Sequence, residues 1–269
     1  MLGSIVGDIA GSRFEFDRGG WSKDFELFTS ESEFTDDTVM TVAVAEALMN
    51  AGKDGSLEDI RRECIKSMRK WGHLYPDAGY GARFIYWLYD INPKPYGSFG
   101  NGSAMRVSPA GLFYDSLERT REVARATAEV SHNHPEGIKG AECTASVMYM
   151  GRNGYSKEEI KEYVVNEFGY DLNSTVDELR KHHHHDETCM DSLPKALISF
   201  FEGENFEDVI RNAVSLGGDT DTLAAIAGAM AEGYYGVDKN ISSEAASYLT
   251  KEINETITKF ENLIGRKQL

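Results

Sequence analysis

The chain has 269 residues, of which 41% are hydrophobic and 27% are charged, and its formal net charge at neutral pH is −16. This length and composition are typical of a globular protein with one large domain or two small ones. The negative charge would repel duplex nucleic acid, and the sequence has no run of about 18 apolar residues that could span a membrane.

The N-terminal stretch MLGSIVGDIAGS is apolar, but it carries Asp8 and lacks the basic leading region of a secretory signal. Cys64, Cys143 and Cys189 are odd in number and form no CxxC pair, which argues against a disulfide framework or a zinc knuckle. We therefore expect a cytoplasmic protein whose cysteines are reduced.

The segment FTDDTVMT, residues 34–41, places two adjacent carboxylates before an apolar stretch. Helix capping would account for it, with Thr35 as N-cap and with Asp36 and Asp37 near the positive end of the helix dipole. Two carboxylates about 5 Å apart, however, repel by roughly 3 kcal/mol at an effective dielectric constant of about 20, and the dipole returns at most about 1 kcal/mol to each. A divalent cation would compensate for the difference, so both interpretations stay open.

Helical periodicity recurs along the chain, whereas strand-like alternation is scarce. Ser56 and Ser156 each begin a capping box, and small residues near the C-terminal end predict a helix that is buried on most sides. The predicted helices cover residues 56–71 and 115–130, begin at 135 and at 156, and cover 194–201, 206–215 and 223–235. No composition shift marks a boundary, so we expect one all-α domain over residues 1–269.

The segment YGSFGNGSAMRVSP, residues 96–109, holds Gly97, Gly100 and Gly102. Such a loop can turn successive backbone amides toward one point and bind phosphate oxygens, and Asn101 tolerates left-handed turn geometry. An ordinary irregular loop is the alternative, because the segment matches neither a Walker A sequence nor GxGxxG.

Histidines and a lone glutamate are further candidates. His132 and His134, in SHNHPEG, precede a predicted helix and are either structural or catalytic. Glu15 follows a glycine-rich start and is either a surface residue or a functional one. The four consecutive histidines at 182–185 point in all directions around a helix and cannot all bind one ion, which favours a solvated run.

The segment GGDTDT, residues 217–222, is a second acidic start before a small, apolar helix. Asp219, Asp221 and Thr222 could direct several oxygens to one place, and such ligands suit Mg²⁺ or Mn²⁺. If the two acidic helix starts converge, they would form a binuclear centre. Aspartyl-phosphate phosphatases also carry a D-x-D pattern, but here Leu223 occupies the Thr or Val position and no parallel-sheet pattern surrounds it.

In their order along the chain, these segments resemble the ADP-ribosylglycohydrolase family, which includes dinitrogenase reductase-activating glycohydrolase and the ADP-ribosyl-acceptor hydrolases. The resembling segments are GSIVGDIAGSRFEF, FTDDTVMT, GYGARF, SFGNGSAMRVSPAG, SHNHPEG and GGDTDTLAAIAGAMAEG. The resemblance implies a compact, single-domain orthogonal helical bundle with a site for two Mg²⁺ or Mn²⁺ ions.

The resemblance also assigns residues by motif match. The metal-ligand positions fall on Thr35, Asp36, Asp37, Asp219, Asp221 and Thr222. The loop that wraps the diphosphate of the ligand falls on Ser98, Phe99, Gly100, Asn101 and Gly102. Glu15 matches a glutamate on a flap near the metals, His132 a histidine near the phosphate or ribose, and Asp77 an acid that contacts the ribose.

The implied activity is hydrolysis of the glycosidic bond between ADP-ribose and an acceptor, with Glu15, Asp37 and Asp221 as the catalytic carboxylates. The acceptor would be a protein side chain, a nucleobase or an acetyl ester, and free ADP-ribose would be the product. Two other functions remain: a non-catalytic module that binds ADP-ribose, and a metal-dependent phosphohydrolase.

Overall fold

The computed structural model describes residues 1–17, 22–181 and 186–265. These residues contain helices and no strand; an isolated antiparallel bridge joins Gly100 and Thr188. In chain order the elements are α1 (Leu2–Gly11), η1 (Ser12–Asp17), α2 (Asp36–Ala51), α3 (Leu57–Leu74), α4 (Ala82–Tyr89), α5 (Gly102–Met105), α6 (Ser108–Phe113), α7 (Leu117–Glu129), α8 (Pro135–Arg152), α9 (Lys157–Phe168), α10 (Val176–Leu179), α11 (Cys189–Glu202), α12 (Phe206–Val214), α13 (Thr220–Tyr235), α14 (Lys239–Ala246) and α15 (Lys251–Leu263). The predicted all-α class is confirmed.

Side-chain caps fix several helix starts, as the sequence predicts. The Thr35 side chain accepts a hydrogen bond from the Asp37 amide at 3.3 Å, so α2 begins at the first acidic segment. Complete capping boxes begin α3 at Ser56 and α9 at Ser156. The prediction for α11 was wrong at its start, because Thr188 caps the helix and Pro194 lies inside it.

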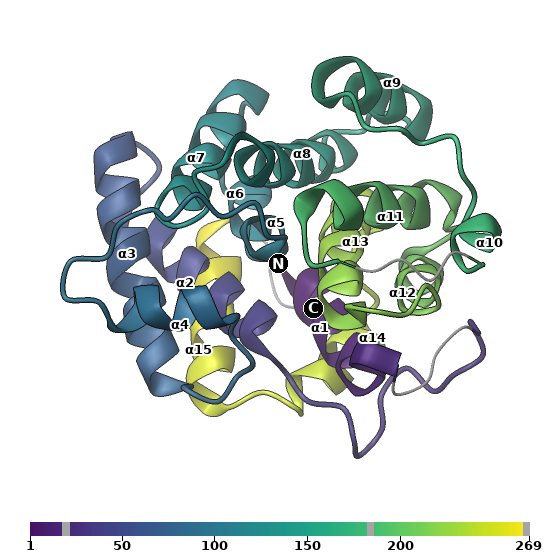
Figure 1. The fold of residues 1–269 in the computed structure, drawn as a ribbon, viewed down its shortest axis with the longest axis horizontal. Helices are drawn as coiled ribbons and strands as arrows, with labels where there is room; N and C mark the ends of the chain where they lie inside the picture. The colour runs from purple at the N-terminus through teal and green to yellow at the C-terminus, as the bar shows by residue number, and fades with distance from the viewer. Residues whose placement is uncertain (18–21, 182–185, 266–269) are drawn as a thin grey trace.

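Helix α1 lies between two sets of helices (Figure 1). Helices α2, α3, α4 and α15 lie on one side, α11, α12 and α13 lie on the other, and α1 contacts both α2 and α13. The first acidic segment begins α2 and the second begins α13. The arrangement of α1 between these two helices therefore decides how the two acidic segments are placed relative to each other.

Glycine allows α1 and α13 to approach until their backbones touch. A Cβ atom added at Gly7 would lie 2.0 Å from the carbonyl oxygen of Ala224, and one added at Gly3 would lie 2.2 Å from that of Gly228. Near the end of α1, the Thr220 hydroxyl donates to the Gly11 carbonyl oxygen at 2.9 Å. This hydrogen bond places the start of α13 next to the C-terminal end of α1.

Two expectations about the rest of the chain can be compared with the structure. The three cysteines are free thiols and all are buried. None of the helices in the described ranges combines the length and the apolar character that a membrane crossing requires.

We expect Gly7→Ala to destabilise the protein by about 3 kcal/mol, because the added methyl group meets backbone that cannot move aside without separating the two helices. The matched control is Gly81→Ala, where an added Cβ has no heavy atom within 4 Å. Urea-induced unfolding measures both effects. Equal unfolding midpoints for the two variants would contradict the close helix contact.

Candidate active site

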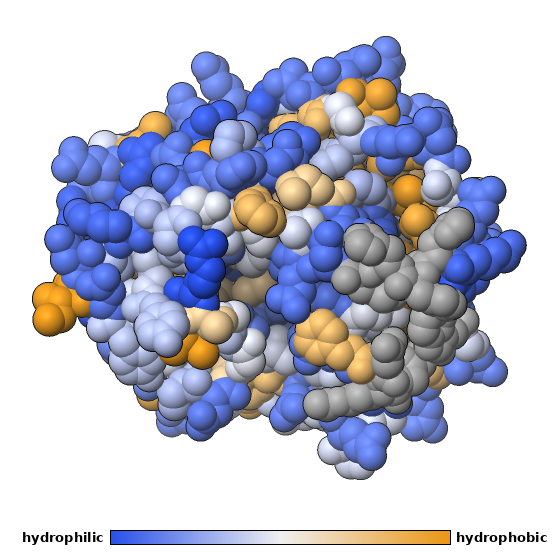
Figure 2. Space-filling view, viewed as in Figure 1, coloured by the Kyte–Doolittle hydropathy of each residue, from blue (hydrophilic) through white to orange (hydrophobic). Residues whose placement is uncertain are grey.

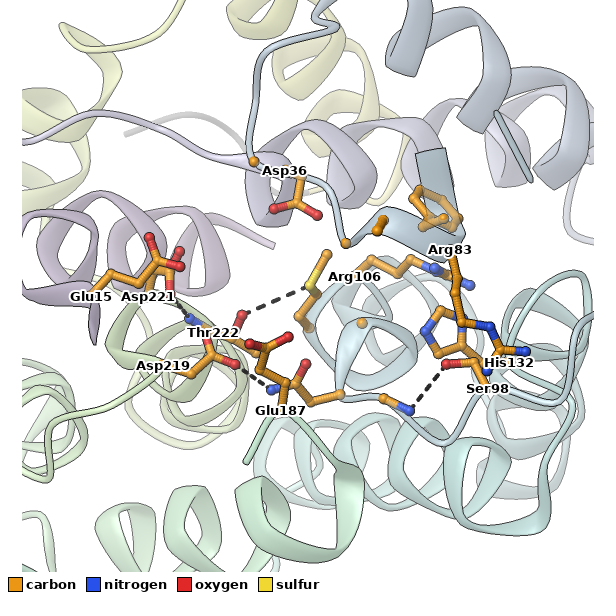
Figure 3. Close-up of a pocket in the computed structure, with 18 of the residues that line it drawn as sticks. Glu15, Asp36, Arg83, Ser98, Arg106, His132, Glu187, Asp219, Asp221 and Thr222 are labelled. Carbon is orange, nitrogen blue, oxygen red and sulfur yellow. Dashed lines mark hydrogen bonds between the residues drawn. The ribbon is translucent and has the colours of Figure 1, made fainter. Parts of the chain in front are cut away.

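A cavity of about 480 Å³ lies between the starts of α2 and α13, and Figure 2 shows the hollowed face of the molecule. Its lining comes from η1, the start of α2, α4, the glycine loop with α5, and the start of α13. Charges of opposite sign lie on its two sides (Figure 3). The acidic side carries Glu15, Asp36, Asp219 and Asp221, and the basic side carries Arg83, Arg106 and His132.

The two acidic helix starts meet on the acidic side. The Thr222 hydroxyl donates to Asp37 Oδ2 at 3.0 Å and so joins α13 to α2. Carboxylate oxygens of Glu15, Asp219 and Asp221 all lie within 4.8 Å of one another. The two acidic segments, which lie far apart in the sequence, are thus in direct contact. The carboxylates of Glu15, Asp219 and Asp221 form a group that could hold a metal ion.

Asp8 supports this cluster through hydrogen bonds to the first turn of α2, a role that was not predicted from the sequence. Its buried carboxylate accepts hydrogen bonds from the amides of Thr35 and Thr38, each at 3.0 Å, and from their hydroxyls at 2.8 and 2.5 Å. Burial raises the pKa of Asp8 to about 6, although these hydrogen bonds favour its charged form. A carboxylate within an apolar helix was the available signal, because such a group needs partners.

The chemistry of the cluster fits a hard divalent cation. Asp37 is only 2% exposed, and its Oδ1 atom has no hydrogen-bond partner in the part of the chain that the structure describes. Burial first, and neighbouring carboxylates second, raise the pKa values of Asp36, Asp37 and Asp221 well above the ordinary value. Within the described ranges none of the three pairs with Lys or Arg. The charge that they would carry when ionised is therefore left for a cation to neutralise.

A backbone kink holds Glu15 beside the cluster. Glu15 has an extended conformation, and Phe16 after it has φ 50° and ψ 60°, in the left-handed region that favours glycine. The Phe16 amide donates to the Gly218 carbonyl oxygen at 2.8 Å, which ties this segment to the start of α13. A strained residue fixed next to buried acids is typical of a functional site.

Two backbone amides of the glycine loop already have hydrogen-bond partners within the chain. The Gly100 amide donates to Ser98 Oγ at 3.2 Å, and the Asn101 amide donates to the Glu187 carbonyl oxygen at 2.8 Å. Asn101 has a right-handed backbone conformation, and the left-handed residue of the loop is Gly97. The Asn101 side chain instead donates to Asp219 Oδ2 at 2.6 Å, so the loop braces the acidic cluster.

Most of the residues assigned to the ligand lie at the cavity, and two lie away from it. Ser98, Gly100, Asn101, Gly102 and His132 line the cavity. Phe99 is outside the lining; its ring meets that of His134 edge-on at 5.3 Å. Asp77 is exposed on the connection between α3 and α4 and is also outside the lining. The histidine run at 182–185 lies outside the described residues.

Arg106 and Arg83 form the basic side and were also missed by the sequence analysis. Arg106 is 1% exposed, and its Nη2 atom donates to Ser131 Oγ at 2.8 Å. Its Nε atom has no hydrogen-bond partner among the residues described. Burial lowers the pKa of Arg106 to about 10, so it remains charged at neutral pH. The Arg83 guanidinium lies 4.8 Å from the centre of the Tyr96 ring. An arginine inside the apolar stretch AMRVSPAGLF was the signal that could have identified Arg106.

His132 lies between the arginines and the glycine loop. It is 5% exposed, and burial followed by the charges of Arg106 and Arg83 lowers its pKa well below the ordinary value. The imidazole is therefore neutral at neutral pH. A neutral ring can act as a hydrogen-bond donor through one nitrogen and as an acceptor through the other.

Comparison with known proteins relates nearly the whole chain to one protein family. The family model of the ADP-ribosylglycohydrolases matches residues 1–268. Human ADP-ribosylhydrolase ARH3 is 26% identical over 89% of this chain and 85% of its own length. ADP-ribosylarginine hydrolase Tri1 of Pseudomonas putida is 26% identical over 88% of this chain and 70% of its own length. A solved structure of an ADP-ribosylglycohydrolase-related protein complex has a TM-score of 0.70 at 23% identity, over 98% of this chain and 95% of its own, which confirms the fold.

We expect the metal-free protein to become more stable as the pH falls from 7.5 to 5.5. A carboxyl group whose pKa is raised by folding binds its proton at a higher pH in the folded state than in the unfolded state, so protonation stabilises the fold. For Asp8 this stabilisation grows as the pH falls from about 6 to the ordinary pKa of 3.8. The pKa values of Asp36, Asp37 and Asp221 are raised in the same way, so these groups also stabilise the fold as the pH falls. The lowered pKa of His132 has the opposite effect on stability below pH 6.5. Each extra bound proton changes the unfolding free energy by up to about 1.4 kcal/mol per pH unit.

Thermal unfolding in EDTA across this pH range measures the effect. Asp37→Asn is the matched variant, because it removes one of the raised carboxyl groups and should flatten the pH dependence. Saturating Mn²⁺ should stabilise the wild type at pH 7.5 and reverse the trend, since acid then competes with the cation. Identical slopes for wild type and variant in EDTA would show that Asp37 is not a perturbed acid.

Proposed function

The chain belongs to the ADP-ribosylglycohydrolase family, and on that premise we propose that it is an enzyme that hydrolyses the glycosidic bond between ADP-ribose and an acceptor. Relatives carry the names ADP-ribosylhydrolase and ADP-ribosylarginine hydrolase, which supports the reaction class. The observation that carries the proposal is one cavity with an acidic cluster on one side and, on the other, the buried Arg106 and His132 together with the exposed Arg83. ADP-ribose matches this arrangement, because it has an anionic diphosphate at its centre for the basic side and ribose hydroxyls at its end for the acidic side.

The diphosphate would lie on the basic side. Arg83, Arg106 and the neutral imidazole of His132 line that side and are all hydrogen-bond donors. They lower the electrostatic barrier that a net charge of −16 presents to an anionic ligand. Phe84 lies under the Arg106 guanidinium at 5.5 Å and keeps this charge away from water, which strengthens its attraction for an anion.

The distal ribose would lie on the acidic side, together with two Mg²⁺ or Mn²⁺ ions. Residues that would hold the ions are Thr35, Asp36, Asp37, Asp219, Asp221 and Thr222. When bound, such ions supply positive charge at the sugar oxygens and at the attacking water. The buried Oδ1 atom of Asp37, which has no hydrogen-bond partner among the described residues, supports the presence of a ligand there.

In the reaction, the bond from the anomeric carbon C1″ to the acceptor nitrogen or oxygen breaks, and the oxygen of water forms a new bond to C1″. Glu15 is the carboxylate that we assign to the water, from which it removes a proton; the leaving acceptor gains a proton. The fixed position of Glu15 beside Asp219 and Asp221 supports this assignment. Carboxylates around the sugar also stabilise the positive charge that develops on the ring in the transition state.

Two other functions make different predictions about products. A non-catalytic ADP-ribose-binding module would bind ADP-ribose tightly and release none from a conjugate. A metal-dependent phosphohydrolase would release inorganic phosphate. The acceptor is set by what lies outside the ribose site, so arginine, serine, nucleobase and acetyl-ester conjugates all belong in the substrate panel.

We expect Asp37→Asn and Asp221→Asn each to lower the release of ADP-ribose by at least about a hundredfold, because each replaces a charged ligand by a neutral one. Chromatography of the products from the conjugate panel, with Mg²⁺, Mn²⁺ or EDTA, provides the measurement. Asp54→Asn, an exposed acid in the turn after α2, serves as the control and should retain activity.

Two results would refute the role of the metal site, and failure to release ADP-ribose from any conjugate would refute the hydrolysis itself. One is full activity of the wild type in excess EDTA. The other is full activity of both cluster variants with Mn²⁺ present, since a functional metal site cannot tolerate either change. Release of phosphate in place of ADP-ribose would identify a phosphohydrolase.

A further inference from the structure

A line of two hydrogen bonds runs from Arg106 to the ring of His132. Arg106 Nη2 lies 2.8 Å from Ser131 Oγ, and Ser131 Oγ lies 2.8 Å from His132 Nδ1. Ser131 and Arg106 are 0% and 1% exposed, so water does not compete for these bonds. The ring of Tyr96 lies 5.8 Å from that of His132, and the ring of Phe84 lies 6.3 Å away on the α4 side.

Counting protons along this line gives the tautomer of the histidine. A guanidinium can only donate, so Ser131 Oγ must accept from Arg106. Within the described residues, His132 Nδ1 is the acceptor that remains for the proton of the hydroxyl. Nδ1 therefore carries a lone pair. Because burial and the nearby arginines keep the ring neutral, its single proton lies on Nε2.

The Nε2 atom faces the side of the cavity where the glycine loop runs. A Cβ atom added at Gly102 would lie 3.2 Å from Nε2, and one added at Gly100 would lie 3.6 Å from it. Figure 3 shows the ring of His132 at the basic side of the cavity, between Arg83 and Ser98. Glycine at both positions leaves the space in front of Nε2 open to a ligand.

We propose that Ser131 and Arg106 are positioning residues that fix His132 as the Nε2–H tautomer, so that it donates a hydrogen bond to a diphosphate oxygen of the ligand. The proposal rests on the proposed function for the nature of the ligand, but the tautomer is a property of the ligand-free protein. The opposite tautomer would direct a lone pair at an anionic oxygen and repel it. Ser131 thus acts on the ligand only through His132.

The tautomer can be measured directly. In long-range ¹H–¹⁵N spectra of ligand-free protein with ¹⁵N-labelled histidine, we expect His132 to show a protonated Nε2 and an unprotonated Nδ1. The spectrum of the H132Q variant, which lacks these signals, identifies them among the seven histidines. S131A should give intermediate shifts at both nitrogens, because two tautomers then exchange, and the hydroxyl-retaining S131T should restore the single form.

Binding of ADP-ribose by calorimetry tests the consequence. We expect S131A to bind about fivefold more weakly than the wild type, the size of effect that one orienting hydrogen bond produces. In a double-mutant cycle, S131A should change the affinity little when H132Q is already present, since glutamine presents its own amide donor. S146A removes another fully buried hydroxyl, which donates to the Glu142 carbonyl oxygen at 2.7 Å away from the cavity lining, and should leave affinity unchanged.

Several outcomes would overturn the inference. They are a protonated Nδ1 in the wild type, an unchanged tautomer in S131A, or the same loss of affinity from S131A with and without H132Q. Thermal unfolding of S131A beside S146A separates a general loss of stability from the specific effect. If the wild type binds no ADP-ribose, the proposed function fails, and the spectra of the ligand-free protein still decide whether the tautomer is fixed as described.

Discussion

Buried and partly buried carboxylates that pair with no Lys or Arg among the described residues are the constraint on which this structure depends. Asp36, Asp37, Asp219 and Asp221 come from two helix starts and repel one another, yet α1 fixes both helices in place. The direct bond from Thr222 to Asp37 and the support of Asp8 beneath Thr35 and Thr38 resist that repulsion. A fold that holds like charges together in this way stores unfavourable free energy, and the binding of a hard cation would release it.

The acidic and the basic residues of the cavity come from different elements of the fold. Asp36, Asp219 and Asp221 come from helix starts, where the dipole is positive and side-chain oxygens converge, and Glu15 comes from η1. The opposite side takes Arg83 from α4 and Arg106 from the end of α5. Burying a guanidinium without a carboxylate partner is costly, so hydrogen bonds to Thr127 and Ser131 and the ring of Phe84 support Arg106. This separation allows a strongly negative protein to offer one place to an anion.

The same hydrogen bonds that stabilise the site also connect its two sides. The side-chain amide of Asn101, in the glycine loop, donates to Asp219, and its backbone amide donates to the Glu187 carbonyl oxygen. The loop, the acidic cluster and the segment before α11 therefore share one hydrogen-bond network. His132 is held from behind by Ser131 and Arg106. Side chains fixed by several partners lose less freedom when a ligand arrives, and this favours both affinity and a precise position of the reacting carbon.

Local patterns predicted several of the helices, their capping residues and the two acidic starts, because capping at Thr35, Ser56 and Ser156 involves only neighbours along the chain. Helices α1, α4, α14 and α15 were among those not predicted. The motif order was also enough to suggest the family and half of the residues that line the cavity. Tertiary structure alone decided that Thr222 reaches Asp37, that Asp8 and Arg106 belong to the site, and that Phe99 and Asp77 lie outside the lining. These features depend on helices crossing at short range through glycine backbones, and distances between segments so far apart in sequence follow from packing that no local pattern encodes.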